Sequence, residues 1–253
     1  MSRFRFDYAL TLHFSAPVSR HTFLLRFCPV SDARQQVWGV GTFCQPDSQL
    51  PLNADGFGNL CACGHIEEPH DKLSLQVCGE ALVRDLPVDG TWMGIYARPT
   101  PLTWANGALA ALAAGAKGFP MEVAMEIARR LRDRVRYQQG VTDGQTTAAE
   151  AFQRGEGVCQ DMAHMLLAAL RSRRMAARYV VGLIPGEGVT HAWVEVWDGR
   201  GYAGVDPTHL CPADERYLCV NRGRDSRDCA INRGVFVGTA GQTMTVRAKM
   251  TEI

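Results

Sequence analysis

The protein has 253 residues, of which 46% are hydrophobic and 21% charged, a composition typical of a globular protein with one sizeable core or two smaller ones. Its 27 basic and 26 acidic residues nearly cancel, so charge gives no reason to expect a nucleic-acid or anionic-membrane partner. No apolar run approaches the roughly 20 residues of a membrane span. The opening "MSRFRFDYAL" lacks the apolar segment of a secretory signal, so we expect a cytoplasmic protein without a membrane partner.

Residues 1–95 predict an antiparallel β-domain. Four of their segments combine partial alternation of apolar and polar residues with aromatic and β-branched side chains: "RFRFDYALTLHF", "HTFLLRFCPV", "VWGVGTFCQP" and "KLSLQVCGEALV". The stretch "NADGFGN", between two of them, has the glycines and asparagine of a tight turn. The two prolines of "RPTPLTW" then mark a boundary before the next part of the chain.

Residues 103–137 change to a helical pattern. In "GFPMEVAMEIARRLRDRVRY" apolar residues recur every three to four positions. Arginines alternate with these apolar residues, which favours a solvated helix face over a binding stripe. The arginines concerned are Arg129, Arg130, Arg132, Arg134 and Arg136.

Two further helices are predicted around a sharp turn. Thr147 and Glu150 have capping-box spacing, which predicts a short helix that ends at Gly155. Gly155 and Gly157 allow the backbone to turn, and the next helix begins at or near Cys159. Its sequence, "CQDMAHMLLAALRS", is apolar almost all round, so we expect it at the centre of its domain.

The position of Cys159 at this helix start predicts a nucleophile. The unpaired N–H groups and partial positive charge of a helix N-terminus favour a thiolate over a thiol. The same N–H groups can receive the oxyanion of a tetrahedral intermediate. A cysteine that only fills space would more naturally lie in the middle of the apolar run.

A base and a residue that orients it are predicted downstream. In "THAWVEVWDGRGYAGVDPTH", two strands flank the turn "DGRG", with His191 at the start of the first and Asp206 at the end of the second. Antiparallel pairing would bring these two side chains together. A carboxylate in that position holds the imidazole tautomer, as a thiolate nucleophile requires.

The nine cysteines raise an alternative, a metal-dependent or redox protein. Their odd number and the lack of an export signal favour reduced thiols. Cys61, Cys63 and His65 could form a zinc site with another cysteine of the same region (Cys28, Cys44 or Cys78), but the chain has no C-x-x-C pair. We therefore interpret these cysteines, like Cys211, Cys219 and Cys229, as small buried hydrophobes. The sequence has no EF-hand loop, so calcium dependence is not expected. We expect neither a metal nor a cofactor.

These segments resemble the bacterial branch of the transglutaminase-like superfamily. The core resemblance lies in "GVCQDMAHMLLAALRS", "ARYVVGL", "HAWVEVW" and "VDPTH", and that of the preceding domain in "SAPVSRHTFLLRFCP", "DGFGN" and "EEPHDKLSL". It implies an α+β protein with an N-terminal β-sandwich at residues 1–95 and a papain-like core at residues 100–253 that includes the C-terminal strands. It also implies Cys159 as nucleophile, His191 as base and Asp206 as the orienting acid.

Nearby residues are weaker candidates. The side chain of Gln160 or Tyr137 could complete the oxyanion hole, and the sequence does not choose between them. Trp193 is expected to pack under the site, with shaping of the substrate groove as its alternative role. For Asp161 and His164, one turn along the helix, we expect capping or structural hydrogen bonds, with His164 as an alternative base. His209 is expected in a loop that could touch substrate.

The chemistry implied by this triad is acyl transfer through a thioester, on a peptide or protein substrate. Hydrolysis is favoured over transfer to an amine, which makes a cysteine protease or amidase the leading hypothesis and a true transglutaminase the alternative. A catalytically silent binding module is the remaining rival, although all three triad positions are present. The β-domain could be either a substrate-recognition arm or a packing partner.

Overall fold

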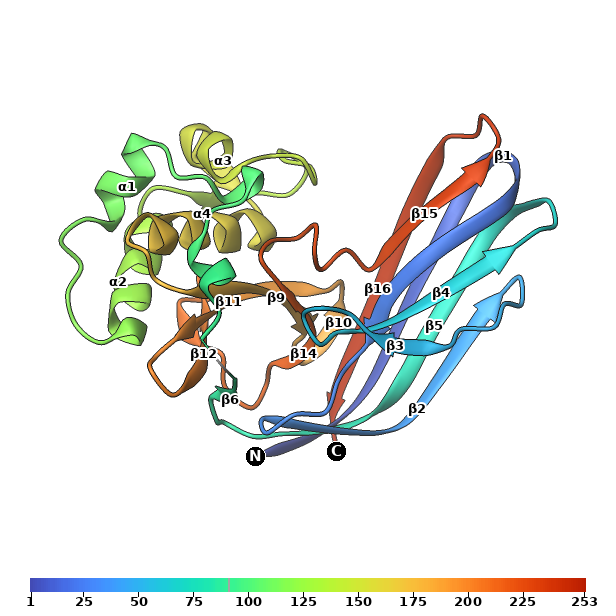
Figure 1. Cartoon of the computed structure of the whole chain (residues 1–253), viewed down its shortest axis with the longest axis horizontal. Coiled ribbons are helices and arrows are strands. Elements are labelled where there is room, and N and C mark those ends of the chain that lie inside the picture. The colour runs from blue at the N-terminus through green and yellow to red at the C-terminus, as the bar shows by residue number, and fades with distance from the viewer. Residues whose placement is uncertain (91) are drawn as a thin grey trace.

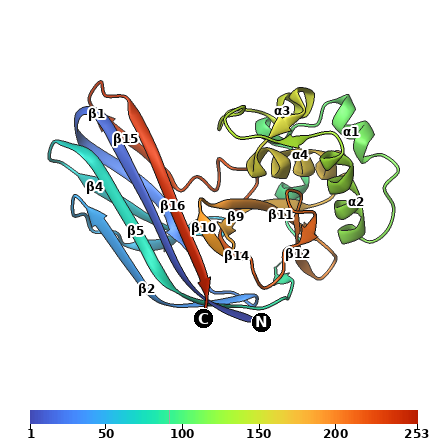
Figure 2. The ribbon, with the colours of Figure 1, turned by 180° about the vertical axis from the view of Figure 1, so that it is seen from behind.

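The computed structural model describes residues 1–90 and 92–253 and has two parts, an elongated β-domain and a mixed core with helices on one side. Both chain ends lie at the same end of the β-domain (Figure 1), where the amide of Ile253 donates to the carbonyl of Arg3 at 2.9 Å. Figure 2 shows the same arrangement from behind. Among the described residues, no helix combines the length and the apolar character that crossing a membrane demands.

The β-domain is built from eight antiparallel strands. They are β1 (Ser2–Cys28), β2 (Gln35–Gln45), β3 (Leu52–Ala54), β4 (Leu60–Ile66), β5 (His70–Val83), β10 (Gly186–Gly188), β15 (Asn232–Val237) and β16 (Gln242–Glu252). The first half of β1 pairs with β5 and β16, and its second half with β4 and β15. Between the halves β1 turns sharply (Figure 1), with Arg20 at φ 48°. The two layers bury alternate residues such as Phe4, Phe6 and Leu25 between them.

The core is a six-stranded sheet with four helices on one face. Its strands are β6 (Val88–Asp89), β9 (Ala177–Leu183), β11 (His191–Trp197), β12 (Gly201–Asp206), β13 (Cys211–Pro212) and β14 (Leu218–Gly223). Its helices are α1 (Gly107–Ala113), α2 (Pro120–Arg132), α3 (Ala148–Arg154) and α4 (Cys159–Ser172), after the short 3-10 helices η1 (Gly94–Ala97) and η2 (Pro101–Thr103). A small parallel pair joins β7 (Arg136–Tyr137) to β8 (Glu156–Gly157).

Helix α4 lies between the sheet and the other helices. Residues from Met162 to Leu170 are fully buried, which is why this helix is apolar all round. It packs on β9 and β11 and contacts α1, α2 and α3. The predicted α+β fold is confirmed.

Two details differ from the sequence-based expectations. We expect the C-terminal strands in the core, and β13 and β14 do join the core sheet, but β15 and β16 pair with β1 in the β-domain. A strand's own alternation gives its buried face but not its partner, so the sequence could not reveal this pairing. Helix α2 ends at Arg132, and Arg136 belongs to β7, so the arginine-rich stretch is not one continuous helix face.

Candidate active site

Cys159 is the first residue of α4, as predicted. Helix α3 ends at Gly155, which adopts a left-handed conformation (φ 73°), and β8 then leads into α4. The carboxylate of Asp161 caps α4 by accepting from the amide of Val158 at 2.8 Å and from the Thr142 hydroxyl at 2.6 Å. A side chain at Gly157 would collide with this cap, since its Cβ would lie 2.7 Å from that of Asp161. The glycine therefore belongs to the architecture that places the thiol.

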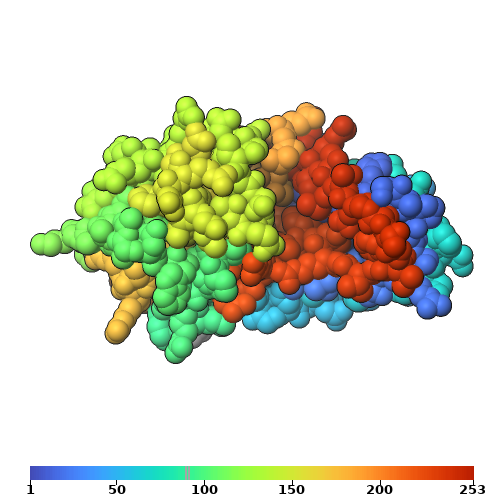
Figure 3. Space-filling view, turned by 90° about the horizontal axis from the view of Figure 1, so that it is seen from above, coloured from blue at the N-terminus to red at the C-terminus, as the bar shows by residue number. Residues whose placement is uncertain are grey.

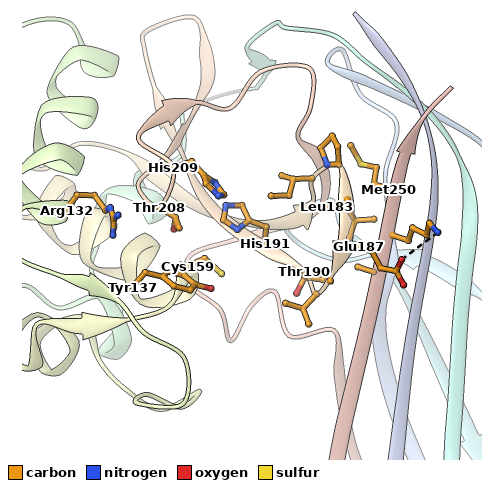
Figure 4. Close-up of a pocket in the computed structure, with 17 residues that line it drawn as sticks. Arg132, Tyr137, Cys159, Leu183, Glu187, Thr190, His191, Thr208, His209 and Met250 are labelled. Carbon is orange, nitrogen blue, oxygen red and sulfur yellow. Dashed lines mark ion pairs between the residues drawn. The ribbon is translucent and has the colours of Figure 1, made fainter.

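His191 and Asp206 meet through the predicted hairpin. Strands β11 and β12 are antiparallel, with Val194 opposite Val205, so the start of one lies beside the end of the other. The His191 Nε2 and Asp206 Oδ2 atoms are 2.7 Å apart, and both side chains are buried. Since Nε2 is engaged, Nδ1 is the ring nitrogen that remains for the thiol of Cys159 (Figure 4).

Asp206 is held by five hydrogen bonds. Its Oδ1 accepts the backbone N–H groups of Thr208 (2.7 Å) and His209 (3.1 Å). Its Oδ2 is bonded to the His191 ring, to Nδ1 of His209 (2.6 Å) and to the hydroxyl of Tyr217 (2.8 Å). Burial alone would raise the pKa of Asp206, but the bonds from His191, His209 and Tyr217 hold it well below its usual range. The carboxylate is therefore ionised at neutral pH.

The same contacts favour a charged imidazole. Burial would lower the pKa of His191, but hydrogen bonds and charge interactions with Asp206 and Cys159 raise it from 6.5 to about 9. The thiol of Cys159, the imidazole of His191 and the buried carboxylate of Asp206 thus form a row of contacts that can stabilise a thiolate–imidazolium pair.

Two grooves meet at Cys159 and His191. The first groove, of about 500 Å³, runs toward β10 and β16 and includes Tyr137, Thr208 and His209 (Figure 4). The second groove, of about 570 Å³, runs between the start of α4, the segment 226–233 and β16. Seen from above, the surface is hollowed where the core meets the red C-terminal strands (Figure 3). The β-domain therefore forms part of the wall of both grooves.

The oxyanion and substrate candidates occupy different places. Tyr137, brought beside Gly157 by the β7–β8 pair, lines the first groove and is 40% exposed. Gln160 lines the second groove. Trp193 lines neither groove; it is buried, with its ring 5.3 Å from that of Tyr217 and stacked 6.4 Å from that of His191. Trp193 thus packs under the site, and the choice between the other two stays a prediction.

The neighbouring helix residues have structural contacts. Asp161 forms the cap described above. His164 is fully buried, its Nε2 accepts from the amide of Ser226 at 3.2 Å, and burial lowers its pKa to about 4. It lines neither groove, so the structure gives no support to His164 as an alternative base.

The contacts of His209 and Tyr217 with Asp206 were not predicted. Only the contact of His209 has a local signal in the sequence. His209 follows Asp206 by three residues in a turn, and in such a turn its ring can reach back to the Asp206 carboxylate. Tyr217 comes from a loop beyond β13, and nothing in its sequence surroundings indicates a contact with Asp206.

One group among the described side chains could hold a metal ion, namely His191, Asp206 and His209, whose ligand atoms lie within 4.8 Å of one another. An ion there would have to replace the hydrogen bonds that orient His191. Cys61, Cys63 and His65, on the same face of β4, do not form such a group within the described ranges. All nine cysteines are free. The expected burial is confirmed for Cys28, Cys44, Cys219 and Cys229 but is wrong for Cys63 and Cys78, which are exposed.

A thiol at a helix start, beside an imidazole that a buried carboxylate orients, defines a site for cysteine-dependent acyl transfer. The transglutaminase-like superfamily matches residues 108–207, and the bacterial transglutaminase-like N-terminal region matches residues 4–81. The chain belongs to the transglutaminase-like superfamily.

The relatives extend over most of the chain. An uncharacterized protein of Mycobacterium leprae is 26% identical, with all of both chains covered. An uncharacterized protein of Mycobacterium tuberculosis is 32% identical over 221 residues, which cover 72% of this chain and 70% of that protein. Among solved structures, a protein of Cytophaga hutchinsonii proposed to be a cysteine protease superposes with a TM-score of 0.81 at 21% identity, covering 100% of this chain and 91% of that one. This last likeness shows the shared fold.

Proposed function

We propose that the protein hydrolyses a peptide or amide bond through a thioester on Cys159. The observation that carries this proposal is the chain of Cys159, His191 and Asp206 at the meeting point of two grooves. An extended peptide laid along both grooves would have one of its amide bonds beside the thiol.

The steps follow from the contacts of these residues. The Cys159 sulfur attacks the carbonyl carbon, and the N–H groups at the start of α4 stabilise the oxyanion. The C–N bond then breaks as His191 gives the Nδ1 proton to the leaving amine, which leaves a thioester. Water attacks the thioester, His191 takes its proton, and the acid product and the thiol are released. Asp206 remains ionised throughout and keeps the imidazole oriented.

Water is the favoured acceptor because Cys159 is partly exposed where the two grooves meet. A strict transglutaminase has to keep water from the thioester while an amine approaches. The amine-transfer alternative uses the same first half of the reaction, so it is tested in the same experiment.

The test is incubation with a peptide library in ¹⁸O-water, with and without an added primary amine, followed by mass spectrometry. We expect new peptide acids that carry ¹⁸O and little amine adduct. Cys159→Ala should form neither product, whereas Cys63→Ala, which changes an exposed cysteine on β4, should behave as wild type. Amine adducts in place of acids would show a transglutaminase, and unchanged turnover in Cys159→Ala would contradict the proposed nucleophile.

A further inference from the structure

The second groove is lined by positively charged side chains and by no negatively charged ones. Two arginines, Arg227 and Arg233, line it, and none of its lining residues is an aspartate or glutamate. The first groove is lined by one acidic side chain, Glu187, which pairs with Lys249 at 3.7 Å, and also by Arg132. The second groove therefore differs from the first in having two arginines and no acidic lining residue.

The two arginines are held in place by neutral groups. The guanidinium of Arg227 donates to the side-chain oxygen of Gln145 at 2.6 Å, and that of Arg233 donates to the carbonyl of Arg227. Neither forms an ion pair with any described residue. The nearby Asp228 forms an ion pair with Arg224 at 2.7 Å, and the charge of Asp228 interacts with Arg233 only at longer range. Both guanidinium groups can thus meet an anion from outside.

A third donor lies in the opposite wall of this groove. Tyr8, on β1, is only 4% exposed and lines the groove, yet its hydroxyl has no hydrogen-bond partner among the described residues. A buried hydroxyl without a partner is unfavourable unless a ligand supplies one. Ala248, opposite Tyr8 on β16, and the groove residues Met244 and Val246 are apolar, so their side chains offer the hydroxyl no oxygen or nitrogen acceptor.

We propose that the second groove binds an acidic stretch of the peptide substrate, whose carboxylates meet Arg227 and Arg233 while Tyr8 donates to a further oxygen. This inference rests on the proposed function for the identity of the reacting bond. Guanidinium groups pair with carboxylates in bidentate geometry, and a groove of one sign selects a ligand of the opposite sign. The recognition would lie on the side of the scissile bond that occupies the second groove, because Arg227, Arg233 and Tyr8 all line that groove.

The experiment compares two short fluorescent peptides that differ only in having Glu or Gln at the flanking positions. Their binding to Cys159→Ala is measured by anisotropy, which requires no turnover. We expect the Glu peptide to bind several-fold to about tenfold more tightly, because it forms two partly exposed charge pairs that the Gln peptide cannot form. The preference should shrink as the salt concentration rises from 50 to 500 mM.

Variants of the groove identify the groups responsible. In the Cys159→Ala background, Arg227→Gln with Arg233→Gln should remove most of the preference for Glu and should weaken the Glu peptide far more than the Gln peptide. Tyr8→Phe should weaken both peptides by a factor of a few. Arg200→Gln, in the turn at the far end of the β11–β12 hairpin, is the matched control for loss of a surface charge and should leave the preference intact.

Equal binding of the two peptides, or no detectable binding of either, would overturn the inference. So would a preference for Glu that persists in the double arginine variant, because the two arginines would then only fasten segment 226–233 to Gln145. The proposed function is tested separately by turnover in the Cys159 protein. Selective binding of the Glu peptide without hydrolysis would contradict the proposed hydrolysis but would still support the proposed specificity of the second groove.

Discussion

Replacement of Asp206 by asparagine should prevent His191 from acting as the base while keeping a side chain of the same shape at position 206. The backbone N–H groups of Thr208 and His209 point at Oδ1, so an asparagine would keep its carbonyl oxygen there and turn its NH₂ group toward His191. The ring Nε2 would then have to accept a hydrogen bond, which moves the imidazole proton to Nδ1, on the side of Cys159. A ring protonated at that atom cannot take the proton of the thiol.

The size of the effect follows from the electrostatics of His191. The increase in its pKa from 6.5 to about 9 corresponds to about 3 kcal/mol, or a few hundredfold in the equilibrium constant for protonation of the ring. Asp206 is one of the two groups that cause this increase. With the wrong tautomer added, we expect Asp206→Asn to lower kcat by about 10²- to 10⁴-fold.

The assay is the rate of iodoacetamide alkylation of each cysteine between pH 5 and 9, followed by peptide mass spectrometry. In the wild type at pH 6, Cys159 should be alkylated faster than the other cysteines, and Asp206→Asn should slow the alkylation of Cys159 about a hundredfold. Exposed Cys63 is an internal standard in the same sample. Asp198→Asn, in the β11–β12 turn, is the matched control, because asparagine suits such a turn. An unchanged rate at Cys159 in Asp206→Asn would refute the assignment of the carboxylate.

The same variant should alter stability in a defined pH window. His191 has a pKa raised from 6.5 to about 9 on folding, so its stabilising contribution is complete below about pH 6.5 and is lost as the pH rises through 9. Asp206 has a lowered pKa, so its contribution is present above about pH 3.8 and is lost as the pH falls further. The deficit in Tm of Asp206→Asn should therefore be largest near pH 5.5 and smaller at pH 9.5, as measured by circular dichroism.

The remaining predictions concern the support of the site. Tyr217→Phe removes the hydroxyl that lies 2.8 Å from Asp206. Loss of this hydrogen bond, worth about 1 kcal/mol, should lower kcat about threefold to tenfold, and an unchanged kcat would contradict this. Glu195→Gln leaves buried Arg178 without its carboxylate and Arg222 with Asp32 as its only acidic partner among the described residues, so urea unfolding should show a loss of about 3–5 kcal/mol. A loss below 1 kcal/mol would show that the arginines find other partners. Dialysis against EDTA should leave the rate of peptide hydrolysis unchanged, and a rate restored only by added metal would revive the metal alternative.

The sequence predicted those parts of the site that depend on local structure. A cysteine after two glycines marks the start of α4, and a short turn between β11 and β12 brings His191 to Asp206. Contacts between distant segments were not predictable in this way. Tyr217 reaches Asp206 from a loop, and the hydrophobic alternation of β16 says nothing of its pairing with β1. Both depend on tertiary packing rather than on periodicity.

That unpredicted pairing bears on the role of the β-domain. Strand β10 pairs with β16, Gly186 opposite Met250 and Gly188 opposite Ala248, and His191 follows β10 by three residues. The segment that leads into β11, the strand that begins with His191, is therefore joined to the β-domain by backbone hydrogen bonds. Because β16 also lines both grooves, the β-domain both anchors the approach to His191 and forms part of the surface that a substrate would meet. These contacts favour a recognition arm over a domain that serves only to pack against the core.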